Sequence, residues 1–392
     1  MKVLVLNSHE DAGRIYGNAL STEQITPIYV DDRKAAATLF LDKEKPDLVL
    51  LSLEWLPFQR IIAVEARKRN IPVLYVMDGV IEWSYIWNNH SFVLKTGTVL
   101  QPLIANHISV IGRHQARILS AMGLGDKISV IGLPRLDGFS IKRVIQSRQR
   151  PTLLICCART PAHNNDHHIN VIRALSDIKK LTDKLNIDCV WRITNGLAQA
   201  LGVRAANGHL TKLLATSSAM IAFPSTIALE GMLSGLPTAI IEYRPVPIYI
   251  DTAWEIRSCD HIYPVINELL YPPAEKIAYQ AYCLEEELSI GNATENLRNL
   301  ILKLGNGEYD DSRTQPQSAY GPLDFKLVHS QISCFSSSAT ATLQYASDAY
   351  MKKEKELYEW SEEVKSTLVI KFIRLLRKAP LFRKINRLLD LI

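Results

Sequence analysis

Short apolar runs alternate with longer stretches of helical periodicity through the first half of the chain. Runs that are apolar on both faces are typical of strands in a parallel sheet that helices cover on both sides. The predicted strands cover 2–6, 25–30, 47–53, 71–77, 107–111 and 127–131, and the predicted helices cover 33–45, 57–70 and 113–122. We therefore expect a Rossmann-like α/β unit over residues 1–147.

A second alternation of the same kind begins at Pro151. Its predicted strands cover 152–157, 188–193, 219–223 and 238–242, and its predicted helices cover 167–185, 210–216, 226–234, 274–287 and 293–304. This pattern predicts a second Rossmann-like unit over 148–304, so that two doubly wound domains face a cleft. Residues 305–341 lose the periodicity and are interpreted as a linker, and 342–392 return to helical spacing as a C-terminal tail.

The basic charge of the chain is concentrated in that tail. The formal net charge is +5, and residues 366–392 hold seven basic residues and one acidic residue, so this segment is +6 and the rest is −1. A general nucleic-acid-binding surface is therefore not expected. No apolar run is long enough for a membrane span or a secretory signal, which predicts a cytoplasmic protein. The six cysteines show neither zinc-finger nor disulfide-framework spacing.

The stretch from Phe223 to Pro237 carries the most chemical information. A strand ends there, Ser225 and Thr226 stand at the start of a helix, and Glu230 follows one turn later on the same face. A helix N-terminus with two hydroxyl groups suits a phosphate, and the carboxylate of Glu230 suits sugar hydroxyls. The alternative is that a hydroxyl only caps the helix while Glu230 is solvated.

Two arginines are candidates for pairing with a diphosphate. Arg159 follows the first strand of the second unit, and Arg192 ends a neighbouring strand, both at the edge where doubly wound folds bind ligands. Ordinary surface pairing is the alternative for each. Three histidines near Asp166 lack the HExxH spacing of a metal site, so no metal is expected.

These features resemble a known family. The segment FPSTIALEGMLSGLP over 223–237 resembles the donor site in the C-terminal half of GT-B glycosyltransferases, with Ser225, Thr226, Glu230, Gly235 and Pro237 at the matching positions. The segment KISVIGLPRLD over 127–137 looks like the domain crossing of bacterial capsule, teichoic-acid and Kdo-type transferases. The resemblance implies a GT-B-like fold and a metal-independent transferase with no cofactor. Its donor would be a nucleotide sugar, and its acceptor a surface polysaccharide or a lipid-linked molecule.

Sugar transfer of the inverting kind needs a base for the acceptor hydroxyl. Asp78 is the first choice because it follows a strand directly, Glu82 is the second and His9 the third. The last of these lies in the expected loop 7–11 after the first strand. A turn formed by Asp78 with exposed neighbours is the alternative. In the crossing segment, we expect Arg135 and Asp137 to pair locally rather than to contact a ligand.

Three other functions remain compatible with the fold. A glycerophosphotransferase would carry a His-Gly base motif, which the sequence lacks. A nucleotide-sugar 2-epimerase would show an acidic, Gly-rich motif in place of Phe223–Thr226. A non-catalytic GT-B-like scaffold that recruits enzymes to a membrane differs from all of these, because it would bind no nucleotide.

The tail predicts peripheral binding to the inner face of the cytoplasmic membrane. Apolar residues recur at helical spacing in 366–392 with basic residues between them, as in helices that lie on anionic bilayers. The full chain should pellet with anionic liposomes at low salt and detach as salt rises, whereas a chain truncated at Glu363 should stay in the supernatant. Equal partitioning of both forms would favour a protein contact instead.

Overall fold

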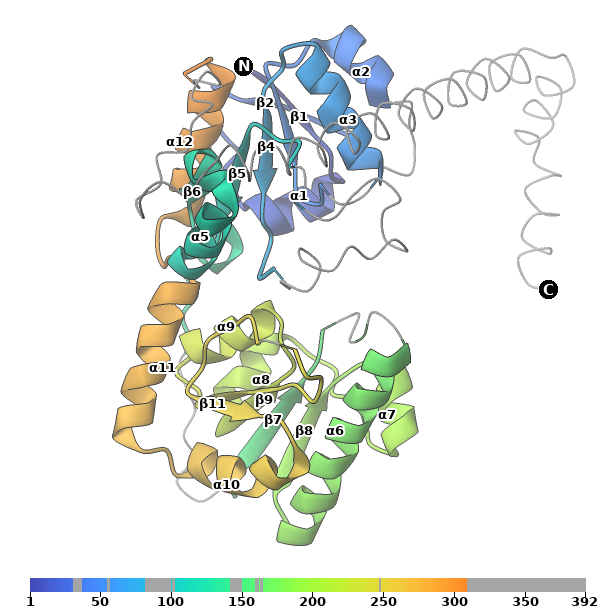
Figure 1. The fold of residues 1–392 in the computed structure, drawn as a ribbon, viewed down its shortest axis with the longest axis vertical. Coiled ribbons are helices and arrows are strands. Elements are labelled where there is room, and N and C mark those ends of the chain that lie inside the picture. Colours follow the sequence, from blue (N-terminus) through green and yellow to red (C-terminus); the bar gives the residue numbers. More distant parts are fainter. Residues whose placement is uncertain are drawn as a thin grey trace, which may run out of the picture.

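The computed structural model describes residues 1–30, 37–54, 57–81, 100, 103–141, 150–158, 162, 165–246 and 248–308. Two parallel sheets stand one above the other in Figure 1, each with helices packed on its faces. The expected α/β architecture with two sheets is confirmed. We call the sheet formed by the N-terminal part of the chain, with its helices, the first unit, and the other the second unit.

The first unit contains a six-stranded sheet in the order β2-β1-β3-β4-β5-β6, with every pair parallel. Its strands are β1 (Lys2–Val5), β2 (Thr26–Tyr29), β3 (Leu48–Leu51), β4 (Val73–Val76), β5 (His107–Val110) and β6 (Ile128–Val130), and its helices are α1 (His9–Tyr16), α2 (Ala37–Glu44), α3 (Pro57–Lys68) and α5 (Arg113–Leu119). The direction of chain progression reverses between β1 and β3, which makes the carboxyl ends of these strands the topological switch point.

The second unit contains a five-stranded parallel sheet in the order β11-β10-β9-β7-β8. Its strands are β7 (Thr152–Cys156), β8 (Asp188–Arg192), β9 (Ala219–Ala222), β10 (Thr238–Ile241) and β11 (Trp254–Ile256), and its helices are α6 (Asn165–Leu185), α7 (Asn195–Leu201), α8 (Leu210–Thr216), α9 (Thr226–Leu233), α10 (Cys259–Leu270) and α11 (Ala274–Glu287). The switch point lies between β7 and β9, so the turn before α9 is placed at the ligand-binding edge.

The loop expected over 7–11 is wrong, because α1 begins at His9. Ser8 has extended backbone angles, and its hydroxyl accepts a hydrogen bond from the backbone N–H of Asp11, as an N-cap does.

Three more elements, α7, β11 and α10, have no counterpart among the expected ones. The predicted helix over 113–122 ends as an α-helix at Leu119, and a π-helical turn follows (Ser120–Leu124), in which Gly123 adopts φ +84°.

The last described helix, α12 (Ala293–Gly305), returns from the second unit to the first (Figure 1). Its buried Leu297, Ile301 and Leu304 recur at helical spacing and join the hydrophobic cluster that includes Val3 and Val5 of β1. The sequence pattern assigned 293–304 to the second unit over 148–304, whereas the apolar face of α12 packs in the core of the first.

Asp137, at the end of the crossing segment over 127–137, fixes the start of α12. Its carboxylate accepts hydrogen bonds from the backbone N–H groups of Ala293 (2.9 Å) and Thr294 (2.6 Å). Asn292, the residue before the helix, provides no side-chain cap, so Asp137 supplies the missing acceptor from a distant part of the chain. The expected local pair of Arg135 and Asp137 is therefore wrong.

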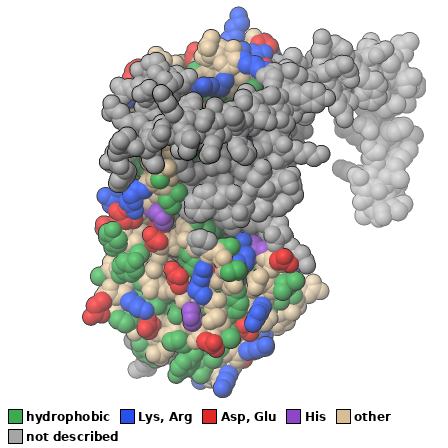
Figure 2. Space-filling model, in the orientation of Figure 1, with side chains coloured by type: hydrophobic (Ala, Val, Ile, Leu, Met, Phe, Trp, Pro, Cys, Tyr) green, Lys and Arg blue, Asp and Glu red, His purple; other side chains and the backbone are tan. Residues whose placement is uncertain are grey.

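Among the residues that the structure describes, none of the helices is both long and apolar enough to span a bilayer. The tail over 366–392 and the linker over 305–341, apart from its first few residues, lie outside the described ranges. Over the part of the second unit visible in Figure 2, basic and acidic side chains are interspersed.

We predict that Asp137→Ala lowers the free energy of unfolding by about 1–2 kcal/mol, because two N–H groups at the start of α12 lose their acceptor. Urea unfolding followed by circular dichroism measures this change. Asp126→Ala, at an exposed position of the same unit, is the matched control and should have no effect. Equal stability of the two variants would contradict the capping role.

Candidate functional site

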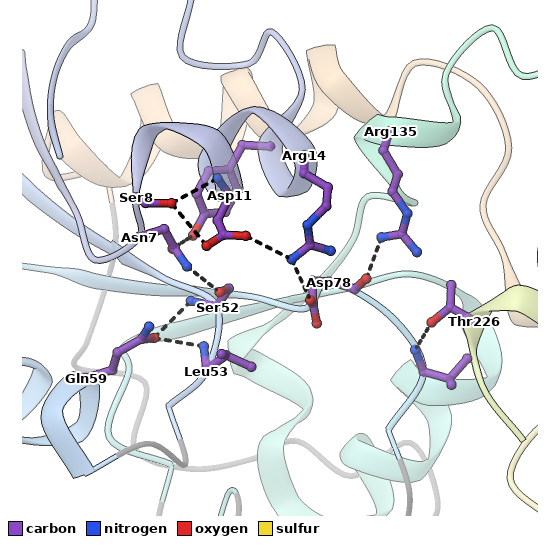
Figure 3. Close-up of polar contacts among 12 residues, drawn as sticks. Asn7, Ser8, Asp11, Arg14, Ser52, Leu53, Gln59, Asp78, Arg135 and Thr226 are labelled. Carbon is purple, nitrogen blue, oxygen red and sulfur yellow. Dashed lines mark hydrogen bonds and ion pairs between the residues drawn. The ribbon is translucent and has the colours of Figure 1, made fainter. Parts of the chain in front are cut away.

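The carboxyl edge of the first sheet is held by a buried network of side chains. The Tyr16 hydroxyl donates to Asn7 Oδ1 (2.6 Å), and Asn7 Nδ2 donates to Ser52 Oγ (3.0 Å). Gln59 completes the network, because its Oε1 accepts from the backbone N–H groups of Ser52 (3.3 Å) and Leu53 (2.9 Å) (Figure 3). These bonds tie the loops after β1 and β3 together at the switch point and keep this edge rigid.

Asp78 lies at the end of β4 between two guanidinium groups. Figure 3 shows Arg14 and Arg135 approaching it from different elements. Arg14 Nη2 is 4.0 Å from Asp78 Oδ2, and Arg135 Nη1 donates to the backbone carbonyl of Asp78 (2.6 Å). The Asp78 side chain is 34% exposed, so its carboxylate is both held in place and accessible.

The turn before α9 meets this edge directly. The backbone N–H of Val80 donates to Thr226 Oγ1 (3.2 Å), which leaves the hydrogen of that hydroxyl group available to donate (Figure 3). A Cβ on Gly79 would lie 2.2 Å from the same oxygen, so only glycine permits this approach. Ser225 is the N-cap residue of α9, but its side chain forms no capping hydrogen bond, and its buried Oγ has no hydrogen-bond partner among the described residues.

Arg135 joins the two units electrostatically. Besides its bond to Asp78, it places Nη2 3.6 Å from Glu230 Oε1 on α9. Burial raises the pKa of Glu230, whose side chain is 17% exposed, and the positive charges of Arg135 and Arg192 act in the opposite direction. We call Asp78, Arg135, Ser225, Thr226 and Glu230 the junction site.

The structure brings together some of the site residues that the sequence predicted. Asp78, Thr226 and Glu230 are linked through the contacts above, and Ser225 adjoins them in the chain. Arg192, at the end of β8, is close enough to Glu230 to affect its pKa. The exposed His9 instead packs its ring edge-on against Tyr29 of β2 (4.9 Å between ring centroids), on the side of β1 away from β4. Glu82 and Arg159 lie outside the described residues.

Sequence reasoning missed the roles of Arg14 and Arg135 at this site. Arg135 belongs to a segment that stood out in the sequence, but its partners are 57 and 95 positions away, at Asp78 and Glu230. Arg14 lies on α1, a helix that the sequence analysis did not predict. The capping pattern Ser8-x-x-Asp11 was the signal for that helix.

The junction site combines groups that suit an anion with groups that suit hydroxyls. The N-terminus of α9, the Thr226 hydroxyl and the guanidinium groups favour a phosphate. The carboxylates of Asp78 and Glu230 can accept hydrogen bonds from a sugar or an acceptor alcohol. One site thus offers binding for a charged phosphate ester and a proton acceptor on the opposite unit.

We predict that Glu230→Gln stabilises the protein, and more so at higher pH. A carboxyl whose pKa is raised by folding stabilises the fold when protonated and loses this contribution as pH rises through its folded pKa. The Tm difference between variant and wild type should therefore grow from about pH 4.5 to about pH 8. Glu255→Gln, at an exposed position of β11, is the control. A difference that does not change with pH would contradict the burial penalty.

Comparisons with known proteins identify the fold. No family model matches this sequence, and no curated protein matches it either.

Solved structures do match. A protein from Listeria monocytogenes assigned as a UDP-N-acetylglucosamine 2-epimerase aligns with a TM-score of 0.55 and 13% identity, over 79% of this chain and 98% of that chain. The UDP-N-acetylglucosamine 2-epimerase from Rickettsia bellii aligns with a TM-score of 0.53 and 12% identity, over 78% and 96%. The UDP-GlcNAc 2-epimerase from Neisseria meningitidis, bound to UDP-GlcNAc, aligns with a TM-score of 0.51 and 15% identity, over 77% and 100%. With two parallel sheets and this set of structural neighbours, the chain has the GT-B fold.

Proposed function

We propose that this protein is an enzyme that transfers a sugar from a nucleotide-activated donor to an acceptor hydroxyl at the junction site. The observation that carries the proposal is the turn before α9, where the buried Ser225 Oγ lies at a helix N-terminus and has no hydrogen-bond partner within the described part of the chain. A buried polar atom without a hydrogen bond is costly, so a ligand atom that satisfies it is favoured. The acceptor would be a surface polysaccharide or a lipid-linked molecule.

The diphosphate of the donor would lie against the N-terminus of α9. Thr226 has a hydroxyl hydrogen to donate, and Arg135 and Arg192 supply positive charge nearby. These groups offset the charge that develops on the leaving nucleotide as the bond to the sugar breaks. Arg159, which lies outside the described residues, is proposed as a further diphosphate partner. Glu230, held 3.6 Å from Arg135, would accept hydrogen bonds from donor hydroxyls.

Asp78 is the proposed base. Its carboxylate lies on the opposite unit from α9 and is partly exposed, so it can take the proton of an acceptor hydroxyl as the new bond to the sugar forms. Arg14 and the bond from Arg135 hold the end of β4 in place. Glu82, outside the described residues, and His9, packed against Tyr29, are the second and third candidates.

Epimerisation of a nucleotide sugar is the second candidate function. The neighbouring structures from Rickettsia bellii and Neisseria meningitidis are UDP-GlcNAc 2-epimerases, and one of them contains UDP-GlcNAc. The two functions use a similar donor but differ in their products. A transferase forms a glycosylated product that depends on the acceptor, whereas an epimerase converts the sugar in the absence of any acceptor.

We predict that Ser225→Ala combined with Thr226→Ala weakens nucleotide binding by about 1–3 kcal/mol, because two hydroxyl partners of a charged phosphate are lost. Calorimetry with UDP, GDP, CMP and CDP compounds measures this change. Ser120→Ala, an exposed hydroxyl of the first unit, is the control. Unchanged affinity in the folded double variant would remove the donor site from this turn. If the wild-type chain binds no nucleotide, the scaffold alternative is favoured.

We predict that Asp78→Asn lowers turnover by about 10²–10⁴ while nucleotide affinity stays the same, since the amide cannot accept the proton. Chromatography of a nucleotide-sugar pool, incubated with and without acceptor glycans, gives both turnover and reaction type. The exposed Asp126→Asn serves as control. Wild-type turnover in Asp78→Asn would transfer the role to Glu82 or His9. Conversion of a nucleotide sugar without acceptor, and with no glycosylated product, would establish epimerisation.

A further inference from the structure

Three potential metal ligands meet on the side of the molecule where α5 contacts α11. They are His114 on α5, Asp251 in the segment between β10 and β11, and Glu287 at the end of α11. One ligand atom from each lies within 4.8 Å of the others. His114 Nδ1 is 2.5 Å from Glu287 Oε1 and 3.6 Å from Asp251 Oδ2. Figure 2 shows basic, acidic and histidine side chains close together over this contact.

Glu287 is unusual for a carboxylate in its burial. The residue is fully buried, and its Oε2 has no hydrogen-bond partner among the described residues. Its other oxygen accepts from the backbone N–H of Asp251 (2.8 Å) and contacts His114. A buried carboxylate oxygen without a partner is costly and is normally satisfied by a cation or a donor. Within the described part of the chain, Glu287 Oε2 therefore lacks the cation or donor that a buried carboxylate oxygen requires.

The nearby arginines are already paired with a different carboxylate. Arg117 and Arg113 both form ion pairs with Glu286. In the second pair, Arg113 Nη2 lies 3.0 Å from Glu286 Oε1. Asp251 and Glu287 thus share one histidine, which carries at most a single positive charge. The cluster has more negative than positive charge when His114 is neutral, which is the form that binds a metal.

We propose that His114, Asp251 and Glu287 form a binding site for a divalent cation of the zinc class. Zinc takes imidazole nitrogen and carboxylate oxygen at about 2.0–2.2 Å, so tetrahedral ligand atoms lie about 3.4 Å apart. The two contacts of His114 Nδ1, at 2.5 and 3.6 Å, lie on either side of that spacing. The metal takes the place of a proton between imidazole and carboxylate. Asp251, with its side chain 55% exposed, leaves the fourth position open to water.

The site lies between the two units. His114 belongs to the first unit, whereas Asp251 and Glu287 belong to the second. The backbone is already closely packed here, because a Cβ on Gly112 would lie 2.1 Å from the carbonyl oxygen of Glu287, and the Ser289 N–H donates to the Ile111 carbonyl (2.8 Å). A bound cation would link the units at this contact and restrict their relative motion. This role is separate from sugar transfer at the junction site.

The test measures binding of Zn²⁺ alone to the full chain, with any affinity tag removed and metal first stripped by a chelator. We expect His114→Gln and Asp251→Asn each to weaken Zn²⁺ binding at least about tenfold relative to wild type. His209→Gln, at an exposed histidine of the second unit, should bind as the wild type does. Because Asp251 is largely exposed, Asp251→Asn should fold normally, which circular dichroism verifies.

A second readout uses Co²⁺ in place of Zn²⁺. Visible absorption bands of tetrahedral Co²⁺ in the wild type, lost in His114→Gln and retained in His209→Gln, would support the assigned ligands. Equal Zn²⁺ affinity of wild type, His114→Gln and Asp251→Asn would overturn the proposal, as would a wild-type chain that binds no Zn²⁺. Neither assay involves a nucleotide or an acceptor, so the result is independent of the proposed function.

Discussion

The Arg135 guanidinium connects the two carboxyl edges on which the candidate chemistry depends. It donates to the Asp78 carbonyl at the end of β4 and lies 3.6 Å from Glu230 on α9. Without this cation, Glu230 would be a largely buried carboxylate influenced only by the charge of Arg192 among the described residues, and burial of an ion without a close partner is strongly unfavourable. One side chain on the crossing segment over 127–137 therefore connects the backbone at the end of β4 with the carboxylate on α9. It also brings positive charge to the turn that holds Ser225 and Thr226.

The sequence predicted the central strands of both sheets well because these strands are buried on both faces. Apolar runs such as 47–53 and 219–223 are recognisable without knowledge of their partners, and β3 and β9 form within them. The predicted helix over 226–234 matches α9 to within one residue, since Gly235 marks its end. The turn that carries Ser225 and Thr226 was found for the same reason.

Elements with weaker local signals were missed. The first helix, α1, is polar and short, and Ser8 is the main indication of its start. In α10, Pro264 lies within the helix and suggests a break that does not occur. Contacts between residues far apart in the chain could not be predicted from the sequence either. The acceptor for the start of α12 is Asp137, 156 residues earlier in the chain. The proposed ligands His114, Asp251 and Glu287 come from three separate segments, so no local spacing could indicate either.

The return of α12 to the first sheet makes that unit discontinuous in the chain. Its strands are all made before residue 131, but the apolar face that covers β1 comes from residues 293–305, after the whole second unit. During synthesis the first sheet therefore emerges without its last helix and must keep an apolar surface exposed until the second unit has been made. The second unit, by contrast, is contiguous and can fold as soon as it leaves the ribosome. The core of the first unit can therefore be completed only after residues 293–305 have been synthesised.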